Sequence, residues 1–446
     1  MKILIIGGGS IGFITAEYFM KEGHDVTVIE HDAARVKTLQ ESLDIHVLQG
    51  KGTDLVVLKE AKVGDMQLFL ALSDDDETNI IACSFARIMG VGKKIARVNN
   101  PYLLTAENTV ALKELGVDEI VNTEQSIIQE VINMVRYPGA TEVKQFLDRE
   151  MTVVVFSFNR ESPYYGKPLK TIEFDFPAIP LGYEQVSDLL PYNEEVIVNE
   201  FLYVYYACES KLLPRLHKKI LPQTRAIRNV MIYGAGFKSS HTAGELGMAI
   251  KKEGVSRVEL VMDDIKGAEV LSAKYPLPVI LGDPSKPQFT KVENLRSTDL
   301  FIGLSSNFEK NLFACSIAYK EKVPYTIALV RYPEHTRFIS AIPLTSLLNP
   351  AIGTANQIMH YHQADTITAR AVITHEQAEC LELMVSEQAK LCGMRMKDMP
   401  FTDSRVIGVR RQGKLATISE EFVFEARDQV LLFLVQGEAE RFKSIM

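Results

Sequence analysis

The chain has 446 residues, enough for two to four domains of about 150 residues, and its composition (46% hydrophobic, 24% charged) is that of a folded globular protein. A formal net charge of −8 without a Lys/Arg-rich run makes nucleic acid an unexpected partner. The five cysteines contain no CxxC pair, which excludes a zinc-ribbon pattern and fits free thiols in a reducing cytoplasm. No apolar run approaches the roughly 20 residues of a membrane-spanning helix, so we expect any membrane role to act through a partner.

The beginning of the chain predicts a nucleotide-binding turn. Residues 2–6 form an apolar stretch typical of a buried strand, and a G-x-G-x-x-G motif follows it directly: Gly7, Gly8, Gly9, Ser10, Ile11 and Gly12. In this motif the first glycine permits a tight turn, the second lets backbone amides approach a phosphate, and the third lets the following helix pack on the strand. The amino end of that helix adds N–H groups and a positive dipole end.

A second buried strand over 25–30 ends in Glu30, eighteen positions beyond Gly12 (30 − 12). This is close to where a Rossmann unit places the carboxylate that binds an adenosine ribose. Strand, glycine turn, helix, strand and acid together therefore predict a nucleotide site. The alternative is a loop of the same shape that binds nothing.

Strands and helices then alternate up to residue 135. Apolar stretches predict further strands over 45–48, 68–72, 94–98 and 119–121, separated by helical stretches, which is the pattern of a doubly wound parallel sheet. An acidic run, Asp74 to Glu77, follows one of these strands. It could bind a divalent ion, but capping of the next helix is the favoured interpretation.

The character of the chain changes from Tyr137-Pro138-Gly139 onwards. A small α+β module is predicted from short strands over 151–158, 178–182 and 201–206. The basic stretch 211–228 is interrupted by two prolines and predicts a helix and a linker. We place a first Rossmann-like domain at 1–140, its module at 141–215 and a linker at 216–228.

The chain then repeats this arrangement. Residues 230–236 (VMIYGAG) restate the opening strand and turn, and residues 311–316 (NLFACS) restate 79–84 (NIIACS). Repetition of whole units at a nearly constant offset indicates a tandem duplication. We expect an α/β fold with two doubly wound parallel-sheet domains, each followed by a small α+β module; the second pair spans 229–366 and 367–446.

The two copies differ at the positions that matter for a ligand. Where the first copy has Gly12, Glu30 and Arg97, the second copy has Ser239, Met262 and Leu329. Close helix packing, ribose recognition and a counter-charge for phosphate would each be lost. We therefore predict a competent nucleotide site in the first copy and a degenerate one in the second.

Five stretches carry a resemblance to a known family: the glycine motif, Val28–Asp32, Gly50–Asp54, Ala71–Asn79 and Ala96–Val98. Their combination resembles the RCK arrangement, a KTN domain followed by a TrkA-C module. The doubled version in one chain resembles TrkA-type regulatory subunits of Trk potassium uptake systems, over essentially the whole length. The resemblance implies a cytoplasmic protein held at the inner face of the cell membrane by a potassium-translocating partner, in a ring of four doubled subunits.

The resemblance also implies roles for individual residues. Those that would wrap the phosphates are Gly7, Gly9, Ser10, Ile11 and Gly12. Glu30 would hold a ribose, Ser73 would lie near the nucleoside and Arg97 would face phosphate. The implied site also includes Gly8, His31, Lys51, Gly52 and Thr53. Two positions depart from the family, which often has an acid in place of Lys51 and a second arginine in place of Asn99, so NAD, NADH, ATP and ADP all remain candidate ligands.

The expected function is regulatory, with nucleotide binding as the signal and a conformational change as the output. Hydride transfer would need an acid/base pair poised at a nicotinamide, and the small modules offer no such constellation. An NAD-dependent oxidoreductase is the alternative. A third possibility is that the small modules bind a second effector, such as a cyclic dinucleotide.

Overall fold

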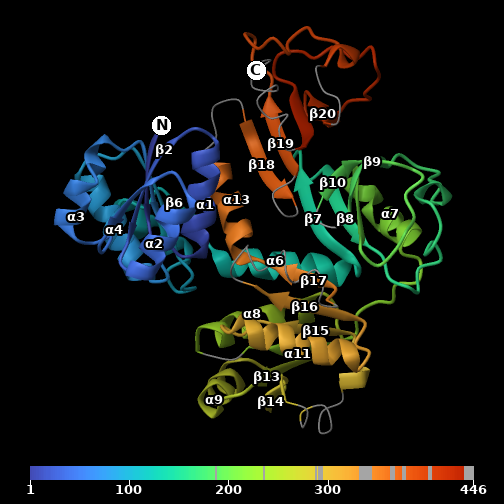
Figure 1. Cartoon of the computed structure of the whole chain (residues 1–446), viewed down its shortest axis with the longest axis horizontal. Helices are drawn as coiled ribbons and strands as arrows, with labels where there is room; N and C mark the ends of the chain where they lie inside the picture. Colours follow the sequence, from blue (N-terminus) through green and yellow to red (C-terminus); the bar gives the residue numbers. More distant parts are fainter. Residues whose placement is uncertain are drawn as a thin grey trace. The chain divides into compact units, whose positions relative to one another are not determined.

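A computed structural model describes residues 1–185, 188–234, 237–286, 289, 295–330, 344–361, 367–373, 378–399 and 404–435. The chain divides into two compact units (Figure 1). Unit 1 comprises Met1–Ile127 with Asn349–His362, and unit 2 comprises Ile128–Leu348 with Gln363–Met446. Within the described ranges, no helix combines the length and the apolar character needed to cross a bilayer. The domain boundaries drawn from the sequence remain predictions.

Unit 1 contains a six-stranded parallel sheet in the order β3-β2-β1-β4-β5-β6 (Figure 1). Its strands are β1 Lys2–Ile6, β2 Asp25–Glu30, β3 His46–Gln49, β4 Leu68–Ala71, β5 Lys93–Arg97 and β6 Glu119–Val121. The helices between them are α1 Ser10–Lys21, α2 Ala33–Ser42, α3 Leu55–Glu60, α4 Asp76–Ile88 and α5 Ala106–Glu114, and α6 Thr123–Arg136 follows β6. This order confirms the predicted doubly wound fold, which binds ligands where the strand order reverses, between β1 and β4.

The strands beside that reversal are buried because they are apolar along their whole length. Residues 3–6 of β1 and all of β4 are at most 2% exposed. Continuous burial is expected for a parallel sheet that helices cover on both faces. The sheet therefore holds the loops at its carboxyl edge on a rigid base.

Helix α13 (Pro350–Tyr361) belongs to unit 1, although it follows the second copy of the sheet in the chain. It packs against α1 and β6. Its Gln357 donates from Nε2 to Oγ of Ser126 (2.8 Å) and accepts at Oε1 from the backbone N–H of Asn122 (3.2 Å). These bonds tie a segment of the second copy to the first turn of α6.

Unit 2 contains the second parallel sheet, in the matching order β14-β13-β12-β15-β16-β17 (Figure 1). Its strands are β12 Asn229–Tyr233, β13 Arg257–Met262, β14 Val279–Leu281, β15 Leu300–Gly303, β16 Tyr325–Leu329 and β17 Ser346–Leu348. Its helices include α8 Phe237–Lys252, α9 Ile265–Lys274 and α11 Phe308–Lys320. The repeated strand order confirms the predicted duplication of the fold.

Two five-stranded antiparallel sheets form the small modules in unit 2. The first, β10-β9-β11-β8-β7, consists of β7 Ala140–Phe146, β8 Met151–Ser157, β9 Ile179–Gln185, β10 Asp188–Pro191 and β11 Leu202–Glu209, and α7 Leu213–Ile220 follows it. The second, β18-β19-β22-β20-β21, consists of β18 Ile367–Ile373, β19 Ala378–Met384, β20 Arg405–Arg411, β21 Lys414–Leu415 and β22 Gln429–Val435. The two modules share a buried apolar core, and the buried carboxylate of Glu382 in the second accepts from the backbone N–H of Leu147 in the first (2.7 Å).

Two strands of the first module, β7 and β10, were not predicted. Strand β7 has a register shift between Ala140 and Glu142 where it pairs with β8, so its side chains do not alternate regularly between buried and exposed. Strand β10 has only four residues, lies at the edge of the sheet and ends in Pro191. Neither segment therefore carries the two-residue periodicity by which strands are recognised.

Candidate nucleotide site

The glycine turn after β1 has little room for side chains at its two ends. Gly7 has φ +97°, a left-handed conformation, and a Cβ there would lie 3.0 Å from the Cα of Ser73. A Cβ on Gly12 would lie 1.8 Å from the carbonyl oxygen of Gly7. The turn is thus pressed against the loop after β4 on one side and against α1 on the other, which agrees with the tight turn and close helix packing expected of the motif.

The middle of the turn has one closed and one open position. A Cβ on Gly8 would lie 2.5 Å from the Cδ1 of Leu39, so a side chain fits there only if Leu39 shifts. A Cβ on Gly9 would meet only the Nη1 of Arg35, at 3.6 Å, which is ordinary contact. Helix α1 begins after Gly9 without a side-chain cap, and Ser10 and Ile11 occupy its first turn. The open face at Gly9 therefore presents a helix amino end, a suitable place for phosphate, beside a guanidinium group.

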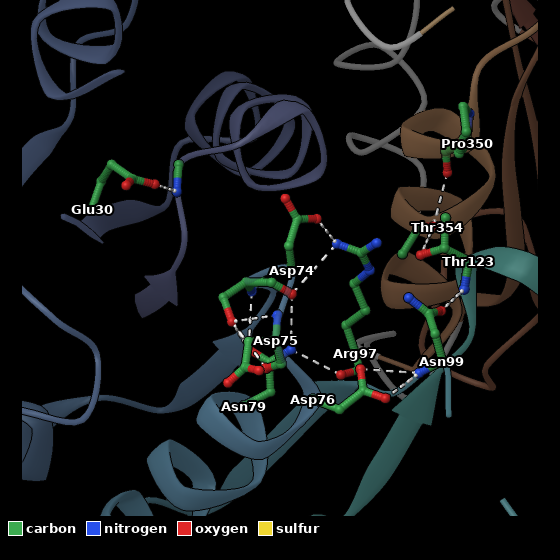
Figure 2. Close-up of polar contacts among 12 residues, drawn as sticks. Glu30, Asp74, Asp75, Asp76, Asn79, Arg97, Asn99, Thr123, Pro350 and Thr354 are labelled. Atoms are coloured by element: carbon green, nitrogen blue, oxygen red, sulfur yellow. Dashed lines mark hydrogen bonds and ion pairs between the residues drawn. The ribbon is translucent and has the colours of Figure 1, made fainter. Parts of the chain in front are cut away.

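Glu30 is buried at the end of β2, with 2% of its surface exposed. Its Oε2 accepts from the backbone N–H of Gly8 (2.6 Å) (Figure 2), and its Oε1 accepts from that of Asp32 (2.8 Å). The Nδ1 of His31 lies 2.8 Å from the same Oε1. The carboxylate therefore fixes the shape of the glycine turn. Since an ionised carboxylate has about four lone-pair sites, it can still accept from a ribose hydroxyl.

The loop after β3 reaches the same edge of the sheet. The backbone N–H of Gly50 donates to the carbonyl of Glu30 (2.9 Å), and a Cβ on Gly52 would lie 2.0 Å from the Cγ2 of Ile6. Lys51 is exposed and Thr53 is half-buried. The structure therefore places this loop beside Glu30 and the end of β1, and Gly52 is needed for packing there.

Asn79 on α4 joins the ends of β4 and β5, a role that reasoning from the sequence missed. It is fully buried, and its Oδ1 accepts from the backbone N–H (2.9 Å) and from the hydroxyl (2.7 Å) of Ser73. Its Nδ2 donates to the carbonyl of Arg97 (2.9 Å). The repeat held the signal, because Asn311 occupies the matching position in the second copy and makes the same bonds to Ser305.

The three aspartates of the acidic loop have different partners, and Figure 2 shows those of Asp74 and Asp76. Asp75 caps α4 by accepting from the backbone N–H of Thr78 (2.8 Å), as the favoured interpretation predicted. Asp76 accepts from the backbone N–H of Asn99 (3.0 Å). Asp74 forms an ion pair with Arg97 (2.6 Å). The part of the chain that the structure describes contains no group of three or more His, Cys, Asp or Glu side chains arranged to hold a metal ion.

Asn99 connects this loop to α6 and α13. Its Oδ1 accepts from the backbone N–H of Thr123, the first residue of α6 (3.0 Å). The hydroxyl oxygens of Thr123 and Thr354 on α13 are 3.1 Å apart, and both side chains are buried (Figure 2). A continuous set of contacts thus links Asp76, through Asn99 and Thr123, to α13.

Two family models match the chain. The TrkA-N domain model matches residues 3–123 and again residues 230–350, and the TrkA-C domain model matches residues 380–446. The chain belongs to the TrkA family. The names of its curated relatives agree with this assignment.

Curated relatives match this TrkA-family chain over its whole length. The Trk system potassium uptake protein TrkA of Halomonas elongata is 24% identical, over 98% of this chain and 96% of the relative. A TrkA homologue of Archaeoglobus fulgidus is 25% identical, over 100% of both. Among solved structures, the GsuK RCK domain has a TM-score of 0.61 at 16% identity, over 100% of this chain and 94% of that one. The GsuK channel bound to NAD has a TM-score of 0.60 at 16% identity, over 100% and 78%. These structures share the fold.

The second copy of the TrkA-N fold has different chemistry at the matching positions. Met262 and Leu329, which replace Glu30 and Arg97, are buried. Nearby, Oδ2 of Asp263 accepts from the hydroxyl of Tyr233 (2.9 Å) and from Nζ of Lys310 (2.8 Å). Its turn residues Ala235 and Gly236, and the side chain of Ser239, lie outside the described residues. That the second site is degenerate stays a prediction, which the apolar replacements support.

Proposed function

We propose that this TrkA-family chain is a nucleotide-sensing regulatory subunit. It binds NAD or NADH, with ATP or ADP as competing possibilities, at the first glycine turn. The bound state opens or closes a Trk-type potassium-translocating protein at the inner face of the cell membrane. The observation that carries the proposal is that one compact unit holds both the glycine turn and α13, a helix contributed by the second copy.

The hydrogen bonds around Asn99 offer a physical route from the ligand to the rest of the chain. A ligand phosphate at Gly9 and Arg97 would act on the end of β5. Asn99 and Thr123 connect that end to Thr354 on α13. Helix α13 follows β17 directly, so the polypeptide itself carries a displacement of α13 into the second parallel sheet. The ligand shifts this equilibrium only if it binds the two arrangements with different affinity.

The environment of Glu30 supports NAD and NADH as ligands. A carboxylate at the end of β2 accepts hydrogen bonds from an unmodified ribose and repels a 2′-phosphate, so NADP should bind weakly. With Met262 and Leu329 in the second copy, we expect one nucleotide per chain. Isothermal titration of the full chain tests both points: two equivalent sites, or a preference for NADP, would contradict them.

The output of the site is proposed to be a change of shape, and the working assembly is proposed to be a ring of four doubled subunits. Addition of candidate hydride acceptors to the chain with NADH should give no turnover; turnover that depends on a substrate would favour the oxidoreductase alternative. Potassium flux through the co-reconstituted membrane partner, with NAD, NADH, ATP and ADP added in turn, tests the regulatory function itself. The proposal fails if none of the four changes the flux.

A further inference from the structure

The guanidinium group of Arg97 is already paired with a carboxylate of its own chain. Its Nη1 donates to Oδ1 of Asp74 (2.6 Å) and lies 3.4 Å from the carbonyl oxygen of Ser73 (Figure 2). Its Nε is buried and has no hydrogen-bond partner among the described residues. The side chain of Arg97 is only 14% exposed, whereas that of Asp74 is 64% exposed. The cation is therefore held in the protein, and the acid lies at the surface, where it can turn away.

Arg97 is close to the proposed phosphate position. The carbonyl of Ser73, which Arg97 approaches, belongs to the residue that lies against Gly7, where an added Cβ would come within 3.0 Å of the Ser73 Cα. Asp74 thus adds a negative charge at the edge of a site proposed to bind phosphate. Its neighbours Asp75 and Asp76 instead accept from backbone N–H groups, so they hold the local fold.

The internal repeat shows that the two members of this pair are replaced together. At the offset of 232 that relates the copies here, Leu329 stands in place of Arg97 and Ser306 in place of Asp74. The supporting Asn79 is kept as Asn311, with the same bonds. The second copy therefore keeps the asparagine bonds that hold this loop although it lacks the ion pair. The loop can fold without that pair.

We propose that Asp74 is a specificity-determining residue of the nucleotide site, because its carboxylate competes with ligand phosphate for Arg97. The proposal rests on the proposed function and adds a ligand class to it. A ligand whose pyrophosphate is esterified at both ends, as in NAD and NADH, carries less negative charge than one with a terminal phosphate, which ionises further. Asp74 therefore disfavours ATP most, ADP less and the dinucleotides least.

The size of the effect follows from the exposure of the pair. Ion pairs with an exposed partner contribute modestly, so removal of the competition at Arg97 should favour ATP over NAD by about two- to fivefold. Removal of the Asp74 charge also removes its repulsion of the ligand, which is greatest for ATP and is screened by salt. The affinity ratio between ATP and NAD is thus a sharper readout than either affinity alone.

The test is isothermal titration of the full chain with NAD, ADP and ATP at low and high ionic strength, comparing wild type, Asp74→Asn and Glu77→Gln. Glu77→Gln is the matched control because it removes one exposed carboxylate from the first turn of α4. We expect Asp74→Asn to raise the ratio of ATP to NAD affinity about two- to fivefold at low salt and less at high salt. The control should leave the ratio near that of wild type.

Any one of four results would overturn the inference. An unchanged ratio in Asp74→Asn, or an equal shift in Glu77→Gln, would exclude competition at Arg97 while leaving nucleotide binding intact. A lower thermal midpoint in Asp74→Asn without a change in the ratio would make the pair purely structural. Failure of wild type to bind any of the three ligands would remove the proposed function and this inference together. Asp74→Ala, which has no side-chain acceptor for Arg97, should shift the ratio in the same direction and checks the asparagine variant.

Discussion

Gly9→Ala and Gly12→Ala add the same methyl group to one turn, and they should fail in different ways. At Gly12 the new Cβ would lie 1.8 Å from the carbonyl oxygen of Gly7, so the backbone must move by about 1.5 Å to restore ordinary contact. Overpacking against a backbone atom costs about 1–3 kcal/mol, towards the upper end where no side chain can rotate away. Alanine is more favourable than glycine in a helix by about 1 kcal/mol, which offsets part of this cost. A net loss of about 2 kcal/mol should lower the melting temperature of the unit by roughly 4–8 °C.

Gly9→Ala should spare the fold and damage binding. Gly9 has φ −67° and ψ −174°, which alanine adopts without strain, and the nearest atom to its Cβ would be the Nη1 of Arg35 at 3.6 Å. The stability change should stay within about 1 kcal/mol. The methyl group would fill the only open position of the turn, so NAD affinity should fall by at least about tenfold, or about 1.4 kcal/mol.

Calorimetric melting and isothermal titration with NAD, applied to both variants and wild type, separate the two effects. Gly9→Ala should melt like wild type and bind poorly, and Gly12→Ala should melt early. Wild-type affinity in Gly9→Ala would refute the close approach of phosphate at this turn. A wild-type melting temperature in Gly12→Ala would refute its role in packing α1.

Three further changes test other contacts in the structure. Glu30→Ala should weaken NAD binding at least about tenfold, since hydrogen bonds to a charged group contribute about 1.5–3 kcal/mol; an unchanged Kd in titration would rule out ribose binding by Glu30. Thr354→Val should keep NAD affinity but reduce the effect of NAD on hydrogen exchange of α13 amides, whereas Thr354→Ser should retain that effect; equal NAD effects in both variants would contradict the route through Thr123. His217 is half-buried, and this desolvation lowers its pKa below the usual 6.5 despite its hydrogen bond to the carbonyl of Pro138, so the unfolded chain binds the proton more readily. Stability should therefore fall as pH drops from about 7 through 6.5, and His217→Gln should flatten that slope in urea unfolding at pH 7.5 and 5.5; identical slopes would disprove it.

Much of the first parallel sheet could be predicted from the sequence because each piece is a local pattern. Strand β1 and the glycine turn are adjacent in the chain, and an apolar stretch followed directly by this glycine motif predicts a buried strand and a nucleotide-binding turn. The same holds for the acid at the end of β2. Because the sequence repeats, the same fold could then be predicted for the second copy.

The position of α13 could not be predicted in this way. In the repeat it is the counterpart of α6, so the sequence suggested that it would stay with its own copy. Its partners for Thr354 and Gln357 lie in residues 122–126, more than two hundred positions earlier, and no local periodicity reports such a contact. Only the structure shows that these polar side chains of α13 are bonded to residues 122–126.

The candidate site shows the same limit at single residues. A positive charge at the end of β5 was expected from Arg97, but its pairing with Asp74 depends on how the ends of β4 and β5 meet at the edge of the sheet. Asn99 was noted as a departure from the family at a position near phosphate. The structure instead shows its side chain bonded to the first residue of α6. Residue identity alone did not distinguish a ligand contact from a structural bond.

Nucleotide at the first glycine turn is proposed to control a potassium-translocating partner. The most direct measurement is potassium flux in vesicles that contain the membrane partner and either the wild-type chain or Gly9→Ala, with and without NAD. We predict that NAD changes the flux with wild type and leaves it unchanged with Gly9→Ala. An equal response to NAD in both, or no response of the wild type to NAD, NADH, ATP or ADP, would contradict it.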